Sequence, residues 1–188
     1  MTRNRRLVVD ADGRASPARF IASPNCDARP ADAAVTLVVV HGISLPPGEF
    51  GGPGIEALFT NRLDQAVHPY YAGIAHLRVS AHFVIRRDGL LLQFVPCSRR
   101  AWHAGASEWK GRARVNDFSV GIELEGTDTL PYATAQYAML ARLLKALGRR
   151  YPLTAIVGHS DVAPGRKTDP GPAFDWERLR RRLAPRPR

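Results

Sequence analysis

Two of the six histidines in the chain stand where a side chain could do metal chemistry. His41 ends the apolar run Thr36 to Val40, and His159 follows the shorter run Ala155 to Val157 after one glycine. A buried strand fixes the residue at its end, so such a histidine can face a cleft at the edge of a sheet. No pair of histidines has the H-x-x-x-H spacing of a helical zinc motif. A metal site would therefore be assembled from distant segments.

The loop after His159 offers a third ligand. Asp161 and Asp169 both lie there, and spacing does not choose between them. Two imidazoles and a carboxylate leave a tetrahedral Zn²⁺ with one position open for water. The structural alternative is that each histidine caps its strand and hydrogen-bonds the backbone.

A carboxylate and a lysine could complete a hydrolytic site. The stretch Ser119 to Glu125 alternates apolar and polar residues, which places Glu123 and Glu125 on one strand face. Glu123 could serve as a general base for an attacking water, or it could belong to an exposed sheet face. Lys167 lies in an irregular loop, where a cation could stabilise an oxyanion or be solvated.

The other four histidines are not predicted to bind metal. His82 lies within a predicted strand and is expected to be a hydrogen-bonded core residue. His103, beside Trp102, could contact a substrate or could simply pack. His68 and His76 flank a pair of tyrosines and are expected at the surface.

The elements that must position these residues are strands mixed with helices. Asp-Gly between two apolar runs predicts a β-hairpin, and helical spacing of apolar residues ends at Gly148, a helix stop. The expected strands are Thr36 to Val40, Ser80 to Arg86, Leu90 to Val95, Ser119 to Glu125 and Ala155 to Val157, and the expected helices are Gly54 to Arg62, Thr134 to Leu147 and Asp175 to Leu183. This order predicts an α/β sheet with helices packed on it.

The net charge of +10 is concentrated at the two ends. Residues 1–20 and 178–188 hold eleven arginines and two aspartates, which leaves the rest of the chain nearly neutral. A basic face interleaved with aromatics, typical of nucleic-acid binding, is therefore not expected. We expect a basic N-terminal extension at 1–20, one folded domain at 21–183 and a basic tail at 184–188. The tails are interpreted as solubilising, with weak contact to polyanions as the alternative.

Apolar runs and cysteines indicate the compartment. No run approaches the roughly 20 residues that span a bilayer, and the apolar stretch Leu7 to Val9 is too short for a secretory signal. We therefore expect no membrane association and a cytoplasmic location. Cys26 and Cys97 form no C-x-x-C pair, so two free thiols are expected, with a single disulfide as the alternative.

Five ordered stretches between residues 38 and 176 carry a resemblance to a known family. They are VVVHGISLPPGEFGG (38–52), AHLRVSAHFVIRRDG (75–89), RAWHAG (100–105), NDFSVGIELEGTDT (116–129) and GHSDVAPGRKTDPGPAFDW (158–176). The sequence resembles the zinc-dependent N-acetylmuramoyl-L-alanine amidases, most closely their cytoplasmic branch acting on 1,6-anhydro-N-acetylmuramyl-L-alanine. Gly42 stands where a relative carries asparagine.

The resemblance implies a role for each matched residue. Its metal ligands fall on His41, His159 and Asp169, and the metal it implies is Zn²⁺. Its general base falls on Glu123 and its catalytic lysine on Lys167. Its substrate-binding residues fall on Tyr70, Arg78 and Arg114. The implied fold is a single domain with a mixed central β-sheet and flanking α-helices.

The implied reaction is hydrolysis of the amide between the lactyl group of muramic acid and L-alanine. The expected substrate is an anhydro-muropeptide met in cytoplasmic peptidoglycan recycling. Two alternatives stay open: an amidase acting on polymeric peptidoglycan, and a recognition module that binds peptidoglycan without cleaving it. All three ligand types are present, which favours an enzyme. A monomer is expected, and no specific nucleic-acid partner.

Overall fold

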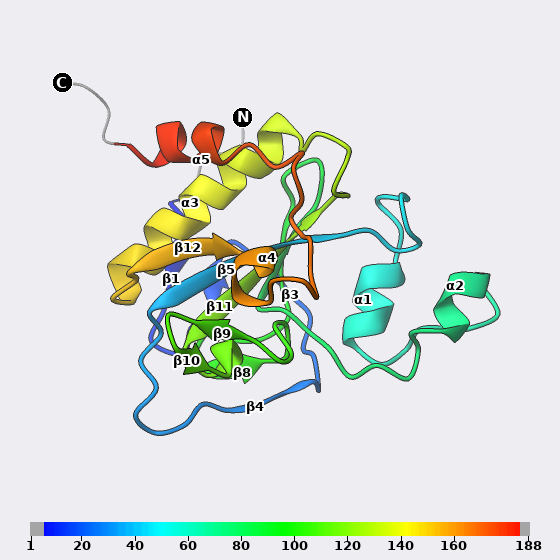
Figure 1. Cartoon of the computed structure of the whole chain (residues 1–188), viewed down its shortest axis with the longest axis horizontal. Helices are drawn as coiled ribbons and strands as arrows, with labels where there is room; N and C mark the ends of the chain where they lie inside the picture. The colour runs from blue at the N-terminus through cyan, green and yellow to red at the C-terminus, as the bar shows by residue number, and fades with distance from the viewer. Residues whose placement is uncertain (1–5, 185–188) are drawn as a thin grey trace.

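The computed structural model describes residues 6–184, so residues 1–5 of the predicted extension and 185–188 of the predicted tail lie outside the described part. Its centre is a six-stranded mixed β-sheet with the order β12-β5-β11-β6-β7-β3. These strands are β3 (Arg19–Phe20), β5 (Leu37–Ile43), β6 (Phe83–Ile85), β7 (Leu91–Gln93), β11 (Ser119–Glu125) and β12 (Ala155–Gly158). Figure 1 shows helices flanking this sheet, which confirms the predicted fold class.

The strands at the centre of the sheet run parallel. β11 pairs in parallel with β5 and β6, and β12 pairs in parallel with β5. β7 returns antiparallel to β6, which confirms the predicted hairpin. The carboxyl ends of the parallel strands therefore meet at one edge, where α/β sheets place their ligand sites.

Helices and short ribbons cover the two faces of the sheet. The helices are α1 (Gly54–Phe59), α2 (Pro69–Ala72), α3 (Thr134–Arg150), α4 (His159–Val162) and α5 (Trp176–Leu183), with a 3₁₀ turn, η1, at Val115–Asp117. The two-stranded ribbons are β1 (Val8–Val9) with β2 (Ala15–Ser16), β4 (Cys26–Ala28) with β8 (Arg99–Ala101), and β9 (Glu108–Trp109) with β10 (Arg112–Ala113). In Figure 1, α3 and α5 lie on one side of the sheet, and ribbons β4–β8 and β9–β10 on the other.

Alternation along β5 and β11 divides the core. Val38 and Val40 of β5 join Val120 and Ile122 of β11 in the cluster that includes α3. The odd-numbered residues point to the opposite face, where Leu37 and other apolar residues pack against the segment around Ala104. Every residue of β11 is buried. The exposed sheet face considered for Glu123 is therefore wrong, because segments distant in sequence cover that face.

Two helices end at different residues from those predicted. α3 continues through Gly148 to Arg150 and stops because Tyr151 precedes Pro152 and takes an extended conformation. α1 ends at Phe59 rather than Arg62, and Asn61 has a left-handed φ of 58° that a helix cannot continue through. α5 begins after Asp175, whose carboxylate accepts from the Arg178 backbone amide, as an N-cap should.

Part of the predicted N-terminal extension packs into the folded body. Leu7, Val9 and Ala15 are buried in the α3 cluster, and β3 is a strand of the main sheet. The guanidinium of Arg149 donates a 3.1 Å hydrogen bond to the Leu7 carbonyl. Among the described residues no helix is long and apolar enough to cross a membrane. Both cysteines are free, as predicted.

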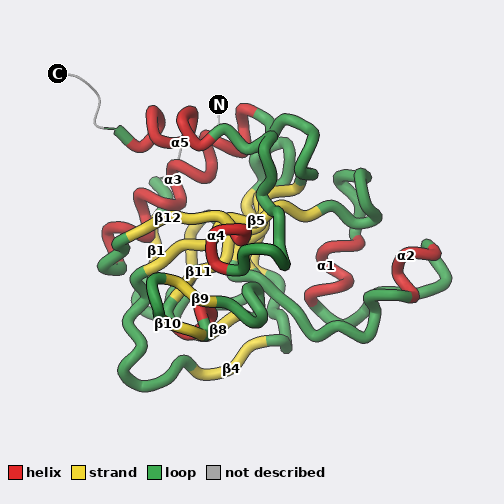
Figure 2. The backbone as a smooth tube through the Cα atoms, viewed as in Figure 1, coloured by secondary structure: helices red, strands yellow, loops and turns green. Residues whose placement is uncertain are grey.

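The connection between β5 and β6 holds a large part of the irregular structure. Figure 2 shows it as mostly loop, with α1 and α2 as short helical pieces away from the sheet. Leu58 and Phe59 of α1 and Tyr71 of α2 pack in an apolar cluster with Val84 of β6. This cluster holds the connection between β5 and β6 in place, and the connection forms one wall of the cleft described below.

Candidate metal centre

His41 and Glu123 lie side by side on neighbouring strands. The parallel register of β5 and β11 pairs them directly, so both side chains point to the same face. His41 lies inside β5 rather than at its end, because pairing with β11 continues to Ile43. Both residues are buried, at 1% and 9% exposure.

His159 and Asp169 reach the same place from the end of β12. His159 is the first residue of α4, directly after the strand. The Asp161 carboxylate accepts a 2.7 Å hydrogen bond from the Gly158 amide and caps that helix. The Ser160 amide donates to the Asp169 carbonyl at 3.0 Å, which draws the later loop back towards the strand end. Asp169, and not Asp161, therefore faces the two histidines.

Three ligand atoms converge in this group. The Nδ1 atoms of His41 and His159 are 3.0 Å apart, and each lies 3.1 Å from Oδ2 of Asp169. A tetrahedral zinc site with ligand distances of about 2.0 Å has edges of about 3.3 Å. His159 Nε2 donates to the Ala104 carbonyl at 3.3 Å, so in the neutral ring the Nδ1 lone pair faces the group. The donor set and its spacing fit a divalent cation.

The charges in the group suit a cation as well. Burial lowers the pKa of His41 to about 4, so its ring is neutral at physiological pH. Burial opposes ionisation of Asp169, but the close contacts of its carboxylate with the rings of His159 and His41 hold its pKa well below the usual range. Two neutral imidazoles and one carboxylate are the forms that bind metal ions.

Glu123 is a buried carboxylate beside this group. Its Oε2 atom has no hydrogen-bond partner among the described residues. Burial, and then the charge of Asp169, raise its pKa well above the usual value, while the charge of Lys167 opposes the rise. A carboxylate whose pKa is raised is a stronger base than an exposed one, which suits it to general acid–base catalysis.

A cleft of about 510 Å³ exposes the group to solvent. Among the residues predicted for the site, it is lined by His41, Glu123, His159, Asp169, Lys167 and Tyr70. Lys167 and Tyr70 come from exposed loop and helix positions on its walls. The structure therefore brings together six of the eight predicted residues.

The two predicted arginines lie outside the cleft lining. The guanidinium of Arg78 donates to the carbonyls of its own segment, including Ala75 at 3.3 Å. Arg114 is exposed and forms an ion pair with Asp117 at 3.2 Å. Their role in substrate binding stays a prediction.

Sequence reasoning missed the tyrosine that joins β5 to the Asp169 loop. The Tyr132 hydroxyl donates to the Pro170 carbonyl at 2.9 Å. A Cβ at Gly42 would lie 2.3 Å from that hydroxyl, and a Cβ at Gly126 would lie 2.4 Å from the ring. The unusual Gly42 therefore leaves room for this tyrosine. Tyr132 lies in a loop without periodicity, so only its tertiary contacts reveal it.

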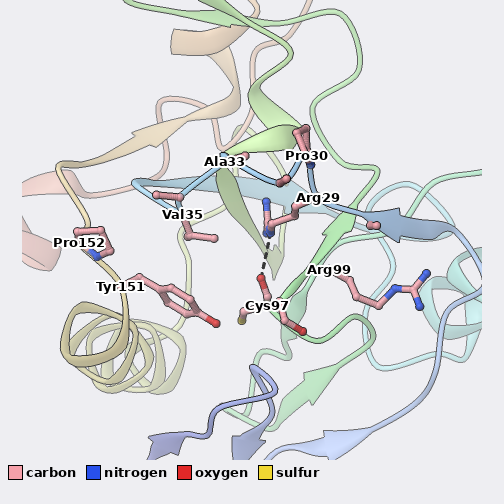
Figure 3. Close-up of a pocket in the computed structure, with 12 residues that line it drawn as sticks. Arg29, Pro30, Ala33, Val35, Cys97, Arg99, Tyr151 and Pro152 are labelled. Carbon is pink, nitrogen blue, oxygen red and sulfur yellow. Dashed lines mark hydrogen bonds between the residues drawn. The ribbon is translucent and has the colours of Figure 1, made fainter.

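A larger surface pocket lies elsewhere on the molecule. It measures about 570 Å³ and includes Arg29, Cys97 and Tyr151 in its lining (Figure 3). It contains none of the predicted site residues, and the Arg29 guanidinium is already engaged by backbone carbonyls such as that of Cys97, 3.1 Å from Nε. The predicted site residues therefore gather around the metal group and not in this pocket.

Comparison with known proteins identifies the family to which the chain belongs. A family of N-acetylmuramoyl-L-alanine amidases matches residues 31–172. The chain is 60% identical to the 1,6-anhydro-N-acetylmuramyl-L-alanine amidase AmpD of Citrobacter freundii, covering 93% of this chain and 94% of the relative. A crystal structure of an AmpD derivative superposes with a TM-score of 0.91 at 58% identity, covering 94% of this chain and 99% of that one.

A more distant likeness carries a ligand. The amidase AmiD of Escherichia coli, solved with anhydro-N-acetylmuramic acid-L-Ala-D-gamma-Glu-L-Lys, matches with a TM-score of 0.58 at 28% identity, covering 94% of this chain and 65% of that one. The chain thus belongs to the N-acetylmuramoyl-L-alanine amidase family. Within that family it belongs with the AmpD-type 1,6-anhydro-N-acetylmuramyl-L-alanine amidases.

Proposed function

We propose that this chain hydrolyses the amide between the lactyl group of 1,6-anhydro-N-acetylmuramic acid and L-alanine, with Zn²⁺ held by His41, His159 and Asp169. The observation that carries the proposal is the convergence of these three ligand atoms beside the buried carboxylate of Glu123, whose Oε2 has no hydrogen-bond partner among the described residues. The AmpD relatives, named for this bond, support the choice of substrate.

The bound metal supplies Lewis acidity towards the carbonyl and a water of lowered pKa. Glu123 receives a proton from the attacking water at Oε2, the atom for which the described part of the chain supplies no hydrogen-bond partner. Its raised pKa lets it keep that proton and then deliver it to the leaving amine of L-alanine. Lys167, on the wall of the cleft, stabilises the oxyanion of the tetrahedral intermediate.

The substrate we propose is a soluble anhydro-muropeptide in the cytoplasm. The ligand in the AmiD complex supports the anhydro sugar and the short stem peptide. Two free thiols suit a reducing compartment. Tyr70 lines the cleft and is proposed to contact the substrate, with Arg78 and Arg114 as partners for the carboxylates of the stem peptide.

Metal analysis and product mass spectrometry test the proposal together. Purified protein should contain about one zinc per chain. It should release free stem peptide from a defined anhydro-muropeptide faster than from intact sacculi. Equal or faster cleavage of sacculi would favour the amidase acting on polymeric peptidoglycan. Binding without any release would favour a recognition module. Full activity after complete removal of metal would overturn the mechanism.

A further inference from the structure

Two consecutive residues contact both histidines of the metal group from behind. His103 and Ala104 belong to the stretch RAWHAG, for which the proposed reaction has no role. His103 Nδ1 lies 3.0 Å from His41 Nε2, and the Ala104 carbonyl lies 3.3 Å from His159 Nε2. Each contact engages the ring nitrogen that faces away from the metal group.

The backbone of this segment is held in place. The Asn116 side-chain oxygen accepts from the amides of His103 at 3.2 Å and Ala104 at 2.9 Å. The guanidinium of Arg166 donates to the Ala104 carbonyl at 2.6 Å. The acceptor for His159 is therefore a carbonyl whose position is set by two other side chains.

The His103 ring is held as firmly as its backbone. Its Nε2 lies 3.1 Å from the Ser119 hydroxyl, at the start of β11. A Cβ at Gly121 would lie 2.4 Å from Cγ of the imidazole, so the ring occupies the space that a side chain at that position would take. The rings of His41 and His103 pack edge to face, with their centroids 5.1 Å apart.

Arg29 fixes the far end of this chain of contacts. Its guanidinium donates to the Ser119 carbonyl at 2.8 Å and to the Cys97 carbonyl at 3.1 Å, the latter drawn in Figure 3. A continuous path of hydrogen-bond contacts therefore runs from Arg29 through Ser119 and His103 to His41.

We propose that His103 is a positioning residue. Its Nδ1 accepts a hydrogen bond from the protonated Nε2 of His41, and this keeps the Nδ1 lone pair of His41 directed at the metal. The inference rests on the proposed zinc site. A neutral imidazole has one donor and one acceptor nitrogen. If Nδ1 of His103 were protonated, Nε2 of His41 would have to accept the hydrogen bond between the two rings. The proton of the neutral His41 ring would then lie on its Nδ1 and block the metal. Only the opposite tautomers leave Nδ1 free, with His103 Nε2 donating to Ser119.

Substitution of His103 tests this role through zinc affinity. His103→Leu removes the acceptor and should weaken zinc binding about 10- to 100-fold, the usual effect of losing such a partner. His103→Asn can place an oxygen near the Nδ1 position and should recover most of that loss. Affinity is measured by competition with a colorimetric chelator, with urea unfolding of the metal-free variants as a check on the fold.

His82→Gln is the matched control, because His82 is also a buried histidine. Its ring nitrogens contact Gly121, Arg99 and Arg29 rather than a residue of the metal group. The variant should bind zinc as the wild type does. The inference is overturned if His103→Leu binds zinc within about twofold of the wild type. It is overturned as well if the Asn and Leu variants lose affinity equally. Failure of the wild type to bind zinc would instead overturn the proposed function.

Tautomer assignment by nitrogen-15 NMR of the wild type needs no variant. In the zinc-loaded protein both His41 and His103 should carry their proton on Nε2. A proton on His103 Nδ1 would contradict the proposal, even if the His103 variants failed to fold.

Discussion

Glu123 and Glu125 are chemically identical and two residues apart, yet their surroundings give them different roles. Glu123 lines the metal cleft, and no other residue between 6 and 184 supplies a hydrogen-bond partner for its Oε2. The Glu125 carboxylate accepts from the Gly51 amide at 2.6 Å, from the Arg86 guanidinium at 3.2 Å and from the Arg87 amide at 3.2 Å. The Oε2 atom of Glu123 is available to take a proton from water, whereas both oxygens of Glu125 already accept hydrogen bonds.

Glu123→Ala should lose about 10²- to 10⁴-fold in kcat, the usual effect of removing a general base, while keeping its zinc. The zinc should remain because Glu123 contributes no atom to the His–His–Asp group. Release of stem peptide and elemental analysis on the same sample measure both quantities. A variant that loses zinc along with activity would assign Glu123 to the metal instead.

Lys167→Ala should lose about 10²- to 10³-fold in kcat, as expected for one oxyanion partner. Lys167 is exposed on the cleft wall, so folding should be unaffected. The Glu123→Ala, Lys167→Ala double variant should lose less than the product of the single effects, because both residues act on one intermediate. Multiplicative losses would show that they act on separate steps.

At the scale of elements, Glu125 holds the loop between β5 and α1 against the sheet. Its bonds join β11 to Gly51 and to Arg86, which also pairs with Glu56 of α1 at 3.0 Å. The loop carries Ser44, Pro47 and Gly48, which line the metal cleft. A strand residue thereby shapes a wall of the cleft without touching the metal group.

Glu125→Ala should lower the free energy of unfolding by about 1–3 kcal/mol, because buried donors lose their acceptor. It should keep zinc and far more activity than Glu123→Ala. Urea unfolding and the stem-peptide assay give the two readings. An inactive Glu125→Ala beside a near-normal Glu123→Ala would move the base by two residues along β11.

At the scale of the whole molecule, the core contains a histidine that folding keeps neutral. His82 is completely buried, accepts from the Gly121 amide at 3.0 Å, and contacts the Arg99 carbonyl and the Arg29 guanidinium. Burial first, and then the charge of Arg29, hold its pKa well below the usual value. Folding therefore excludes a proton that the unfolded chain binds below about pH 6.5.

Stability should consequently fall as the pH drops below about 6.5, because the unfolded state binds more protons than the native state. Between pH 7.5 and 5.5, exclusion of this proton from His82 should account for a loss of about 1 kcal/mol. Wild type and His82→Gln are compared by urea unfolding with chelator present at both pH values, so that metal release does not contribute. The His82→Gln variant should lose less stability over this interval than the wild type. Equal losses would show that His82 is protonated in the native state.

The sequence by itself determined the features that depend on neighbouring residues. Alternation placed Glu123 on the polar side of its strand, the Asp-Gly turn gave the hairpin, and Asp175 marked the start of α5. Local backbone geometry sets these patterns, so a few residues are enough to read them. The resemblance of ordered motifs added the family and the roles implied for the site residues.

Tertiary structure decided what depends on contacts between distant segments. It drew Asp169 to the histidines and left Asp161 as a helix cap. It placed His103 behind His41, although 62 positions separate them. It also buried the face of β11 that carries Glu123. Periodicity says which side chains share a face, but what covers that face depends on packing between remote parts of the chain, and packing sets the chemistry of a buried carboxylate.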